Sequence, residues 1–423
     1  MKAVIQTVKG ARDFYPEEMA VRAWLYGKIR EVSELFGYQE YDGPFLERIE
    51  LYAAKSSDEL VKEQAFTFQD RGGDYITLRP ELTPSLARMV VHKQRALAYP
   101  LRWWSFGPFW RYERPQRGRT REFFQWNIDL IGINAPEADA ELVAVCARFF
   151  QQVGIRPDQV QILVNNRQLI GQELDRLGVA DSSKQAVYHL IDRRDKMIPQ
   201  LWDAHAQEMG LTAGQLEGLK ALLANHELWR KLPGFARFFA AIEAMGVQEY
   251  VRYAPQIIRG LDYYTGVVFE AHDLQGGRAI LGGGHYGNLV SAVGGEPLPG
   301  IGFAMGDVMA TIVLEKYGCI PAQLSNQSDQ VLVTVFNGDY LLKSYRLAAE
   351  LRNAGVKAMV YPEPAKLEKQ LKFADRKGVR FALILGPDED ANDQVTLKDL
   401  AGRQQQTLAR AMAAEALRAM LAR

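Results

Sequence analysis

The sequence predicts a protein that combines α-helices and β-strands in more than one domain, and three observations support this fold class. The chain has 423 residues, and domains commonly contain about 150 residues each. Residues 166–250 are rich in Leu, Ala, Arg and Glu at helical spacing, whereas the part before them contains aromatic, strand-like segments. After residue 330, strand-like and helix-like segments alternate with short connections, which is typical of a small α/β domain with a largely parallel sheet.

Composition and charge exclude several classes of protein. Hydrophobic residues make up 48% and charged residues 24% of the chain, which are ordinary globular values and argue against a disordered or fibrous protein. The 51 Lys and Arg residues balance the 51 Asp and Glu residues, so any nucleic acid must be contacted through local basic patches. There is no run of 18 apolar residues, and we expect no membrane span.

Two features of the sequence predict a cytoplasmic location. Cys146 and Cys319 are the only cysteines, which is too few for a disulfide framework and fits a reducing compartment. The first 19 residues have no apolar core segment and become acidic early, so they resemble neither a signal peptide nor a transit peptide.

The first part of the chain is predicted to begin with an amphipathic helix over 17–35. Apolar residues recur there at helical spacing, and acidic residues occupy the first turn, where the helix dipole favours negative charge. The other elements expected here are a strand over 38–47 that is interrupted at Gly43-Pro44, a hairpin over 66–79, aromatic strands over 102–112 and 122–132, and a helix over 136–153.

The second part is predicted to contain a helical insertion over about 166–250, bounded by the strand-like segments VQILVNN and YAPQIIRG. Gly-rich strands then return, a helix follows over 308–318, and the polar stretch 321–330 indicates a linker. The elements expected after the linker are strands over 331–336, 356–361, 380–386 and 394–400, helices over 339–355 and 366–378, and a final helix.

The strongest local pattern is a basic loop between the two aromatic strands. Five arginines fall within eleven positions: Arg111, Arg114, Arg117, Arg119 and Arg121. Their guanidinium groups repel one another, a stable fold does not require them, and arginine is suited to bidentate phosphate binding. A solvated basic turn would also explain the charges. The flanking aromatic side chains favour a ligand instead, because they offer a flat apolar surface to a base.

The residues of this hairpin resemble motif 2 of the class II aminoacyl-tRNA synthetases, and other segments resemble the histidyl-tRNA synthetase family within that class. The segments that carry the resemblance are KGARDFYPEEM (9–19), LRPELTPSLAR (78–88), FWRYERPQRGRTREF (109–123), RGLDYYTGVVFE (259–270), LGGGHYGNL (281–289) and LKFADRKG (371–378). They follow the family's order over nearly the whole chain.

The resemblance implies an α+β fold with an antiparallel catalytic sheet flanked by helices. The catalytic domain would span 1–325 and include the helical insertion, and an α/β anticodon-binding domain would span 326–423. The implied activity is the ligation of histidine to tRNA. L-histidine reacts with ATP to form histidyl-adenylate, and histidine then passes to the 3′ end of tRNA(His). ATP with Mg²⁺, tRNA(His) and a second copy of the chain are the implied partners. The homodimer would form through the first helix and the strand that ends at Pro44.

The resemblance also assigns roles to residues of the nucleotide site. Arg111 and Arg259 match the two arginines that hold the carboxylate and the α-phosphate, so they are the candidate catalytic residues. Phe123 would lie against the adenine, and Glu113 would orient the base or a magnesium ion. The arginines expected to reach the outer phosphates are Arg119 or Arg121.

The histidine site is implied by a second set of residues. Glu81, Thr83 and Gln125 match positions that bind the α-ammonium group. A neutral imidazole has one donor and one acceptor nitrogen, and Asp129 and Tyr264 match the pair that would bind them. Tyr263 and Tyr286 could line the pocket, although aromatic residues in strands also belong to ordinary cores. Many members of the family have Glu where this chain has Asp129, and the shorter side chain would need the backbone or a water to close the gap.

Two positions depart from the family's usual pattern. Its third motif usually ends in Gly-Leu-Glu-Arg, but this chain has Met309 where the arginine is expected. A thioether cannot replace that cation, so Met309 is not expected to contact the γ-phosphate of ATP as the family's arginine does. His285 and Gly287 stand where Arg and Asp are usual. His285 could be a substitute donor or a structural residue.

Binding of tRNA is predicted from basic residues. Lys369, Lys372 and Arg376 occur at helical spacing in the C-terminal part and would form a cationic face that contacts phosphates, as would Arg117 of the hairpin. A solvated helix face would have the same pattern. The alternative function is a non-catalytic paralogue, the regulatory subunit of ATP phosphoribosyltransferase, which normally lacks the anticodon-binding domain and an intact RGLDYY segment.

Overall fold

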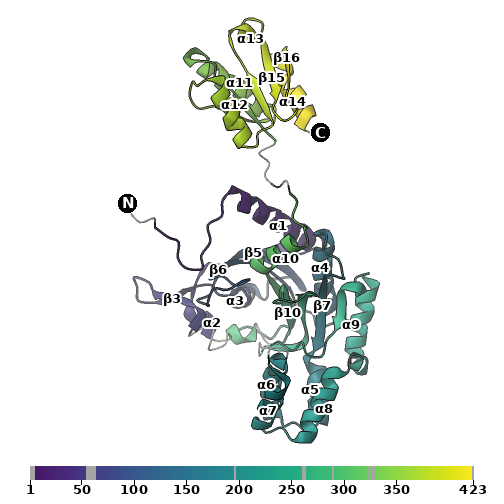
Figure 1. Ribbon diagram of the computed structural model, residues 1–423. Coiled ribbons are helices and arrows are strands. Elements are labelled where there is room, and N and C mark those ends of the chain that lie inside the picture. Colours follow the sequence, from purple (N-terminus) through teal and green to yellow (C-terminus); the bar gives the residue numbers. More distant parts are fainter. Residues whose placement is uncertain are drawn as a thin grey trace. The chain divides into compact units, whose positions relative to one another are not determined.

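The computed structural model describes residues 5–53, 63–194, 197–259, 263–287, 290–322, 324 and 329–421. The chain divides into two compact units, Met1–Pro321 and Ala322–Arg423, each with its own hydrophobic core (Figure 1). Parts of three predicted features lie outside the described residues: positions 260–262 and 288–289 of the two histidine-specific segments, and positions 323 and 325–328 of the predicted linker, which include the boundary after residue 325.

The described helices of the first unit are α1 (Pro16–Leu35), α2 (Ile49–Ala53), α3 (Thr83–Lys93), α4 (Pro136–Gln152), α5 (Arg167–Arg176), α6 (Asp181–Asp192), α7 (Pro199–Glu208), α8 (Ala213–Ala224), α9 (Pro233–Ala244) and α10 (Asp307–Lys316). Short 3-10 helices are η3 (Leu228–Lys231), η4 (Gln248–Tyr250) and η5 (Ser291–Val293). Its strands are β1 (Gln39–Glu40), β2 (Leu46–Arg48), β3 (Phe66–Gln69), β4 (Tyr75–Leu78), β5 (Leu101–Trp110), β6 (Glu122–Ile131), β7 (Val160–Asn166), β8 (Val251–Tyr253), β9 (Tyr264–Asp273), β10 (Leu281–Tyr286) and β11 (Gly300–Gly306).

The first unit is built on a sheet whose strands, among the described residues, follow the order β1-β5-β6-β11-β10-β9-β7-β8. Neighbours from β5 to β7 are antiparallel, as the resemblance implies, whereas the edge pairs β1/β5 and β7/β8 are parallel. Parallel neighbours need a long crossover, and the predicted helical insertion supplies it between β7 and β8. A second sheet has the order β2-β4-β3 and contains the predicted hairpin.

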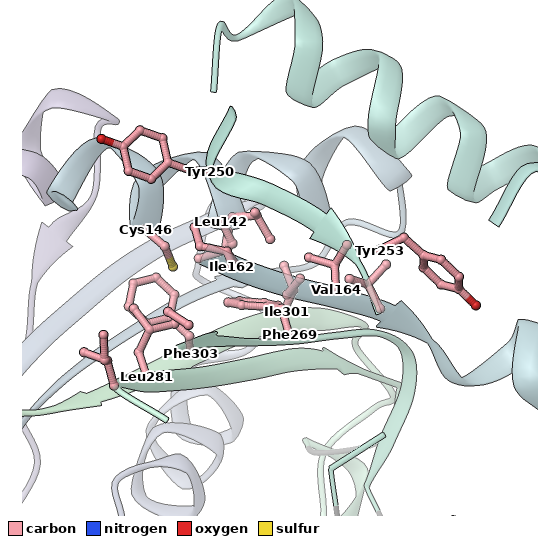
Figure 2. Packing of buried hydrophobic residues seen from close by; sticks show 14 of the residues in the cluster. Leu142, Cys146, Ile162, Val164, Tyr250, Tyr253, Phe269, Leu281, Ile301 and Phe303 are labelled. Carbon is pink, nitrogen blue, oxygen red and sulfur yellow. The ribbon is translucent and has the colours of Figure 1, made fainter. Parts of the chain in front are cut away.

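One face of the main sheet packs against α4 and forms the hydrophobic core. Figure 2 shows Leu142 and Cys146 of α4 facing side chains of the strands, including Phe269 of β9 and Phe303 of β11. These side chains are buried, and Phe303 also meets the ring of Trp126 at 4.8 Å between centroids. Because successive side chains of a strand point to opposite faces of the sheet, the residues that alternate with these core residues lie on the face opposite α4.

The N-terminal helix forms where the sequence predicts it. In α1, Pro16 occupies the first turn together with two glutamates, which suits a helix start because proline needs no hydrogen-bond partner there. Leu25, Ile29 and Val32 are buried on one side of the helix. Among the described helices, none is both long and apolar enough to cross a bilayer.

The second unit contains strands β12 (Gln330–Val333), β13 (Lys357–Val360), β14 (Phe381–Ile384), β15 (Gln394–Asp399) and β16 (Gln404–Ala409). Its helices are η6 (Gly338–Tyr340), α11 (Leu341–Asn353), α12 (Leu367–Arg376), α13 (Pro387–Ala391), η7 (Arg410–Met412) and α14 (Ala413–Leu421). The described strands follow the order β13-β12-β14-β15-β16.

The expectation of a largely parallel sheet in this unit is wrong. Strand β12 pairs in parallel with β13 and β14, but β14/β15 and β15/β16 are antiparallel. The connection from β14 to β15 contains only the five-residue helix α13, which is too short for a crossover between parallel strands. Strand β16, which is rich in glutamine, was not predicted.

Candidate active site

The face of the main sheet opposite α4 is shaped by small residues on β10 and β11. A Cβ atom at Gly302 would lie 2.1 Å from Oδ1 of Asp129, and one at Gly284 would lie 2.7 Å from the ring of Tyr264. Glycine is therefore required at both positions so that these polar side chains can lie flat on the sheet. The alternation along β6 places Phe123, Gln125 and Asp129 on this same face.

A cavity of about 270 Å³ opens on this face. Six of the predicted site residues line it: Arg111, Glu113, Arg119, Phe123, Gln125 and Arg259. They come from the arginine hairpin, from β6 and from the segment before β9, so the fold brings together residues that are distant in sequence. Predicted residues that do not line this cavity are Arg117, Arg121, Glu81, Thr83, Asp129, Tyr263, Tyr264 and Tyr286.

Arg111 is held at the cavity by its surroundings. Its Nε donates a hydrogen bond to the carbonyl oxygen of Pro80 at 2.9 Å, and its guanidinium carbon lies 5.4 Å from the ring centroid of Phe123. The segment that contains Pro80 is fastened in turn by the buried Arg79, whose Nε donates to the carbonyl oxygen of Pro108 on β5 at 2.9 Å. The guanidinium of Arg111 is thus fixed before any ligand arrives.

Arg259 reaches the cavity from a backbone conformation that few residues adopt. Its φ is +52°, and such left-handed geometry in a residue other than glycine is concentrated at functional sites. Nη1 of Arg259 donates to Oε1 of Glu270 at 2.9 Å, while its buried Nε has no hydrogen-bond partner among the described residues. A Cβ atom at Gly282 would lie 1.5 Å from Nη1, so glycine is needed beneath the guanidinium.

The backbone around Arg259 is held by the first residue of the helical insertion. The buried Arg167 donates hydrogen bonds to the carbonyl oxygens of Ile258 at 3.2 Å, Arg259 at 2.8 Å and Tyr264 at 2.9 Å. Three bonds from one guanidinium group therefore tie together the two ends of the segment that contains Arg259. This links the insertion to the cavity.

The remaining hairpin residues divide between the cavity and its surroundings. Arg119 forms an ion pair with the buried Glu113 beside the cavity. Arg121 lies outside it, with its guanidinium carbon 3.9 Å from the ring centroid of Tyr112 and its Nε donating to the carbonyl oxygen of Glu113 at 3.2 Å. Arg117 is exposed. Of the two arginines predicted for the outer phosphates, Arg119 is the one that faces the cavity.

A cluster of one carboxylate and three tyrosines, the tyrosine cluster (Asp129, Tyr263, Tyr264 and Tyr286), lies beside the cavity. Tyr263 is partly buried, and the other three side chains are buried. The hydroxyl of Tyr286 donates to Oδ1 of Asp129 at 2.9 Å, and the rings of Tyr263 and Tyr264 are 4.7 Å apart. The guanidinium carbon of Arg259 lies 5.8 Å from the ring centroid of Tyr264, so this cluster adjoins the cavity. Tyr286 therefore holds the carboxylate of Asp129 in place.

Burial favours the protonated forms of the residues in the tyrosine cluster. It raises the pKa of Asp129 to about 7, although the hydrogen bond from Tyr286 acts in the opposite direction. Burial also raises the pKa of Tyr264 and, more strongly, that of Tyr286. The charge of Glu81 contributes to the raised pKa of both Tyr263 and Tyr264, which places Glu81 close to the cluster. Thr83 is the first residue of α3.

The two departures from the family pattern have different surroundings. Met309 lines the cavity, and a Cβ atom at Gly118 of the hairpin would lie 2.3 Å from its Sδ. His285 is on the other face of β10, where its Nδ1 pairs with Oδ1 of the buried Asp139 at 2.8 Å. His285 does not line the cavity that holds Arg111 and Arg259, so of the two alternatives its position favours a structural residue over a substitute donor. Side-chain alternation along β10 is the physical reason.

Sequence reasoning missed three polar residues near the site. Glu270 and Arg278 line the cavity, and Tyr41 has a buried hydroxyl without a hydrogen-bond partner among the described residues. The negative charge of Asp129 contributes to the raised pKa of Tyr41, so the two side chains are close. Glu270 could have been predicted from side-chain alternation along β9, because it is an even number of residues from Tyr264 and therefore lies on the same face of the strand. No local pattern indicated Arg278 or Tyr41.

The predicted cationic face of the C-terminal unit is exposed but largely paired. Nζ of Lys369 lies 3.2 Å from Oε1 of Glu363, and Nζ of Lys372 lies 2.6 Å from Oε1 of Glu368. Lys369, Lys372 and Arg376 are all exposed on α12. The acidic partners reduce the positive charge that this face offers to a phosphate.

Two family-level sequence models match the chain. The model described as Histidyl-tRNA synthetase matches residues 10–308, and the model described as Anticodon binding domain matches residues 330–420. The chain is 32% identical over 425 residues to "Histidine--tRNA ligase" of Leptospira biflexa, with 96% of this chain and 95% of the relative covered. It is 36% identical over 418 residues to the protein of the same name from Opitutus terrae, with 95% of each chain covered.

A solved structure supports the fold. The histidyl-tRNA synthetase of Nostoc sp. PCC 7120 aligns with a TM-score of 0.82 and 24% sequence identity, and the alignment covers 99% of this chain and 100% of that one. Together with the matches over nearly the whole sequence, this means that the chain belongs to the histidyl-tRNA synthetase family.

Proposed function

We propose that this chain is a histidine–tRNA ligase that activates L-histidine with ATP to histidyl-adenylate and then transfers histidine to the 3′ end of tRNA(His). The observation that carries this proposal is the convergence of Arg111 and Arg259 on one cavity beside the buried Asp129. The names of the curated relatives support the same reaction.

The first step brings two anions together, because the carboxylate of histidine attacks the α-phosphate of ATP and pyrophosphate leaves. Arg111 and Arg259 would hold the carboxylate and the α-phosphate and stabilise the charge that develops between them. Both are fixed in place, Arg111 by its bond to Pro80 and Arg259 by its bond to Glu270. Preorganised cations of this kind lower the barrier without a covalent enzyme intermediate. Phe123, which stacks on Phe109 at 5.9 Å between centroids, would contact the adenine.

Recognition of the imidazole ring is assigned to Asp129 and Tyr264. A carboxylate accepts from one ring nitrogen, and a phenol donates to the other. Glu81, Thr83 and Gln125 would bind the α-ammonium group. A site that satisfies both ring nitrogens rejects analogues that lack either one, because its buried polar groups would lose their partners.

Magnesium fits the carboxylates of the cavity. Mg²⁺ bound to a nucleotide usually keeps several waters and takes phosphate oxygens plus one or two carboxylates. Glu113 and Glu270 both line the cavity and would hold the ion. When bound, the ion would neutralise phosphate charge. No group of three or more potential metal-ligating residues is found in the described part of the chain.

The remaining partners are proposed from the family. The tRNA would contact Arg117 and the second unit, including Lys369, Lys372 and Arg376. The active form would be a homodimer through α1 and the segment that runs from β1 to Pro44, where the predicted strand is shorter and ends at Glu40. We place the reaction in the cytoplasm, and the two free cysteines, Cys146 and Cys319, are compatible with a reducing compartment.

The alternative, a regulatory subunit of ATP phosphoribosyltransferase, is less well supported. Residues 330–420 match an anticodon-binding domain, which that class normally lacks, and the RGLDYY segment is intact in the sequence. The regulatory subunit is not expected to catalyse amino-acid activation, so activity separates the two functions.

The test is histidine-dependent exchange of labelled pyrophosphate into ATP, with the other amino acids as controls. We expect exchange with histidine alone, because only imidazole satisfies both Asp129 and Tyr264. Transfer of labelled histidine to tRNA(His) tests the second step. Folded protein that catalyses no exchange with histidine would contradict the proposed ligase and favour the regulatory subunit.

A further inference from the structure

Arg278 is a cation at the rim of the cavity, in the loop between β9 and β10. It lines the cavity together with Arg119 and Glu113. Among the described residues it forms no hydrogen bond or ion pair with a protein group. Partial burial and the positive charge of Arg119 lower its pKa, although the negative charge of Glu113 acts in the opposite direction. Two guanidinium groups therefore share the single carboxylate of Glu113 in this part of the cavity. One positive charge is left unmatched among these three groups, which favours the binding of an anion.

The side chain of Arg278 lies next to the residue that replaces the family's third-motif arginine. A Cβ atom at Gly118, near the tip of the hairpin, would lie 2.3 Å from Sδ of Met309 and 3.7 Å from Cδ of Arg278. The two side chains therefore approach the same point of the hairpin. Met309 contributes no charge there, whereas Arg278 contributes a guanidinium group from a different segment.

We propose that Arg278 binds the outer phosphates of ATP together with Arg119 and supplies the positive charge that Met309 lacks. This inference rests on the proposed function, since it names the nucleotide of that reaction. Arg111 and Arg259 are each held by a protein oxygen, and Arg119 is paired with Glu113. Arg278 is the cavity arginine without such a partner in the described part of the chain, so it is free to bind an oxyanion in the bidentate manner of arginine.

The first test compares Arg278→Ala with the wild-type protein in histidine-dependent pyrophosphate exchange. Loss of a hydrogen-bonded charge should lower kcat/KM for ATP and for pyrophosphate by about tenfold to a hundredfold, while KM for histidine stays unchanged. Inhibition by AMP should also stay unchanged, because AMP lacks the outer phosphates. The matched control is Gln275→Ala in the same loop, whose side chain is exposed and does not line the cavity.

Rescue separates a phosphate contact from a structural role. Arg278→Lys should keep part of the activity, because it keeps the charge but not the planar fork. Adding Met309→Arg to Arg278→Ala should restore much of the lost kcat/KM for ATP. The assignment to the outer phosphates is wrong if Arg278→Ala leaves kcat/KM for ATP and pyrophosphate unchanged. It is also wrong if the substitution weakens the binding of AMP and the binding of ATP by the same factor.

Equilibrium binding keeps this inference distinguishable from the proposed function. ATP binding to the wild-type protein and to Arg278→Ala is measured without turnover. If the wild-type protein fails in exchange but binds ATP more tightly than Arg278→Ala, the ligase proposal fails and the role of Arg278 stands. If the wild-type protein exchanges and both proteins bind ATP equally, the ligase proposal stands and the role of Arg278 fails.

Discussion

Two parts of the candidate site are built in different ways: the arginine-lined cavity, proposed to bind the phosphates (the phosphate end), and the cluster around Asp129, proposed to bind the imidazole (the imidazole end). At the phosphate end, arginines come from loops and a hairpin and are only partly buried, and two of them, Arg119 and Arg259, are paired with glutamates that line the same cavity. At the imidazole end, Asp129 and Tyr286 stand on strands and are 6% and 2% exposed. One end is a set of charges near solvent, and the other is a buried hydrogen-bonded network.

This difference predicts different sensitivities. Solvent and neighbouring ions screen a charge near the surface, so the phosphate end works through the number and position of its guanidinium groups. A buried carboxylate is governed by desolvation, which raises the pKa of Asp129 to about 7. We therefore expect substitutions at the phosphate end to reduce the rate of activation, and those at the imidazole end to change histidine affinity with pH.

The largest effect is expected for Arg259→Ala. It removes a preorganised donor at the reacting phosphate, so kcat for pyrophosphate exchange should fall by about 10²–10³-fold, while histidine binding remains partly intact. The control is Arg252→Ala on β8, an exposed arginine that does not line the cavity. An unchanged exchange rate in Arg259→Ala would refute the catalytic assignment.

A smaller, pH-dependent effect is expected for Asp129→Asn. Above pH 7 the wild-type carboxylate is ionised and accepts strongly from the imidazole N–H, whereas below pH 7 it is protonated and accepts only weakly. The ratio of KM for histidine in the variant to KM in the wild type should be about tenfold or more at pH 8 and should shrink toward one at pH 6. Protonation of free histidine changes KM by the same factor in both proteins at a given pH, so this effect cancels in the ratio. A ratio that is the same at both pH values would show that Asp129 does not titrate in this range.

The smallest effect is expected for Tyr286→Phe. The substitution removes one hydroxyl that donates to Asp129, so KM for histidine at pH 8 should rise by about fivefold. Because that hydrogen bond lowers the pKa of Asp129, its loss should also move the midpoint of the pH dependence above 7. The measurement is KM for histidine between pH 6 and pH 9 in both proteins. If the midpoint of the pH dependence is the same in both proteins, Tyr286 does not affect the pKa of Asp129 and has only a steric role.

Much of the fold follows from local patterns in the sequence. Helical spacing predicted α1, because burial of one helix face forces that periodicity on the chain. Aromatic residues, which are enriched in strands, predicted β5 and β6. The hairpin of β15 and β16 was partly missed, since Gln404, Gln405 and Gln406 are exposed and carry no apolar alternation. The order of the strands cannot be obtained from periodicity, because pairing depends on contacts between distant segments.

The residues that line the cavity could be predicted together where a single segment contains several of them. Arg111, Glu113, Arg119 and Phe123 belong to one hairpin, and they were found together. Arg278 and Arg167 were not assigned roles, because each acts on a segment that is distant in sequence. Conversely, His285 was considered for the site although the pleat of β10 turns it toward Asp139.

The sequence by itself determined the family, the elements and the chemical types of side chain at the site, since each depends on residue identity and local spacing. The tertiary structure decided which of the cations share a cavity, which of them lack an acidic partner, and how far burial moves the pKa of Asp129. Those properties depend on distances between segments and on exclusion of water, and both arise only when the strands pair and the faces of the sheet are covered.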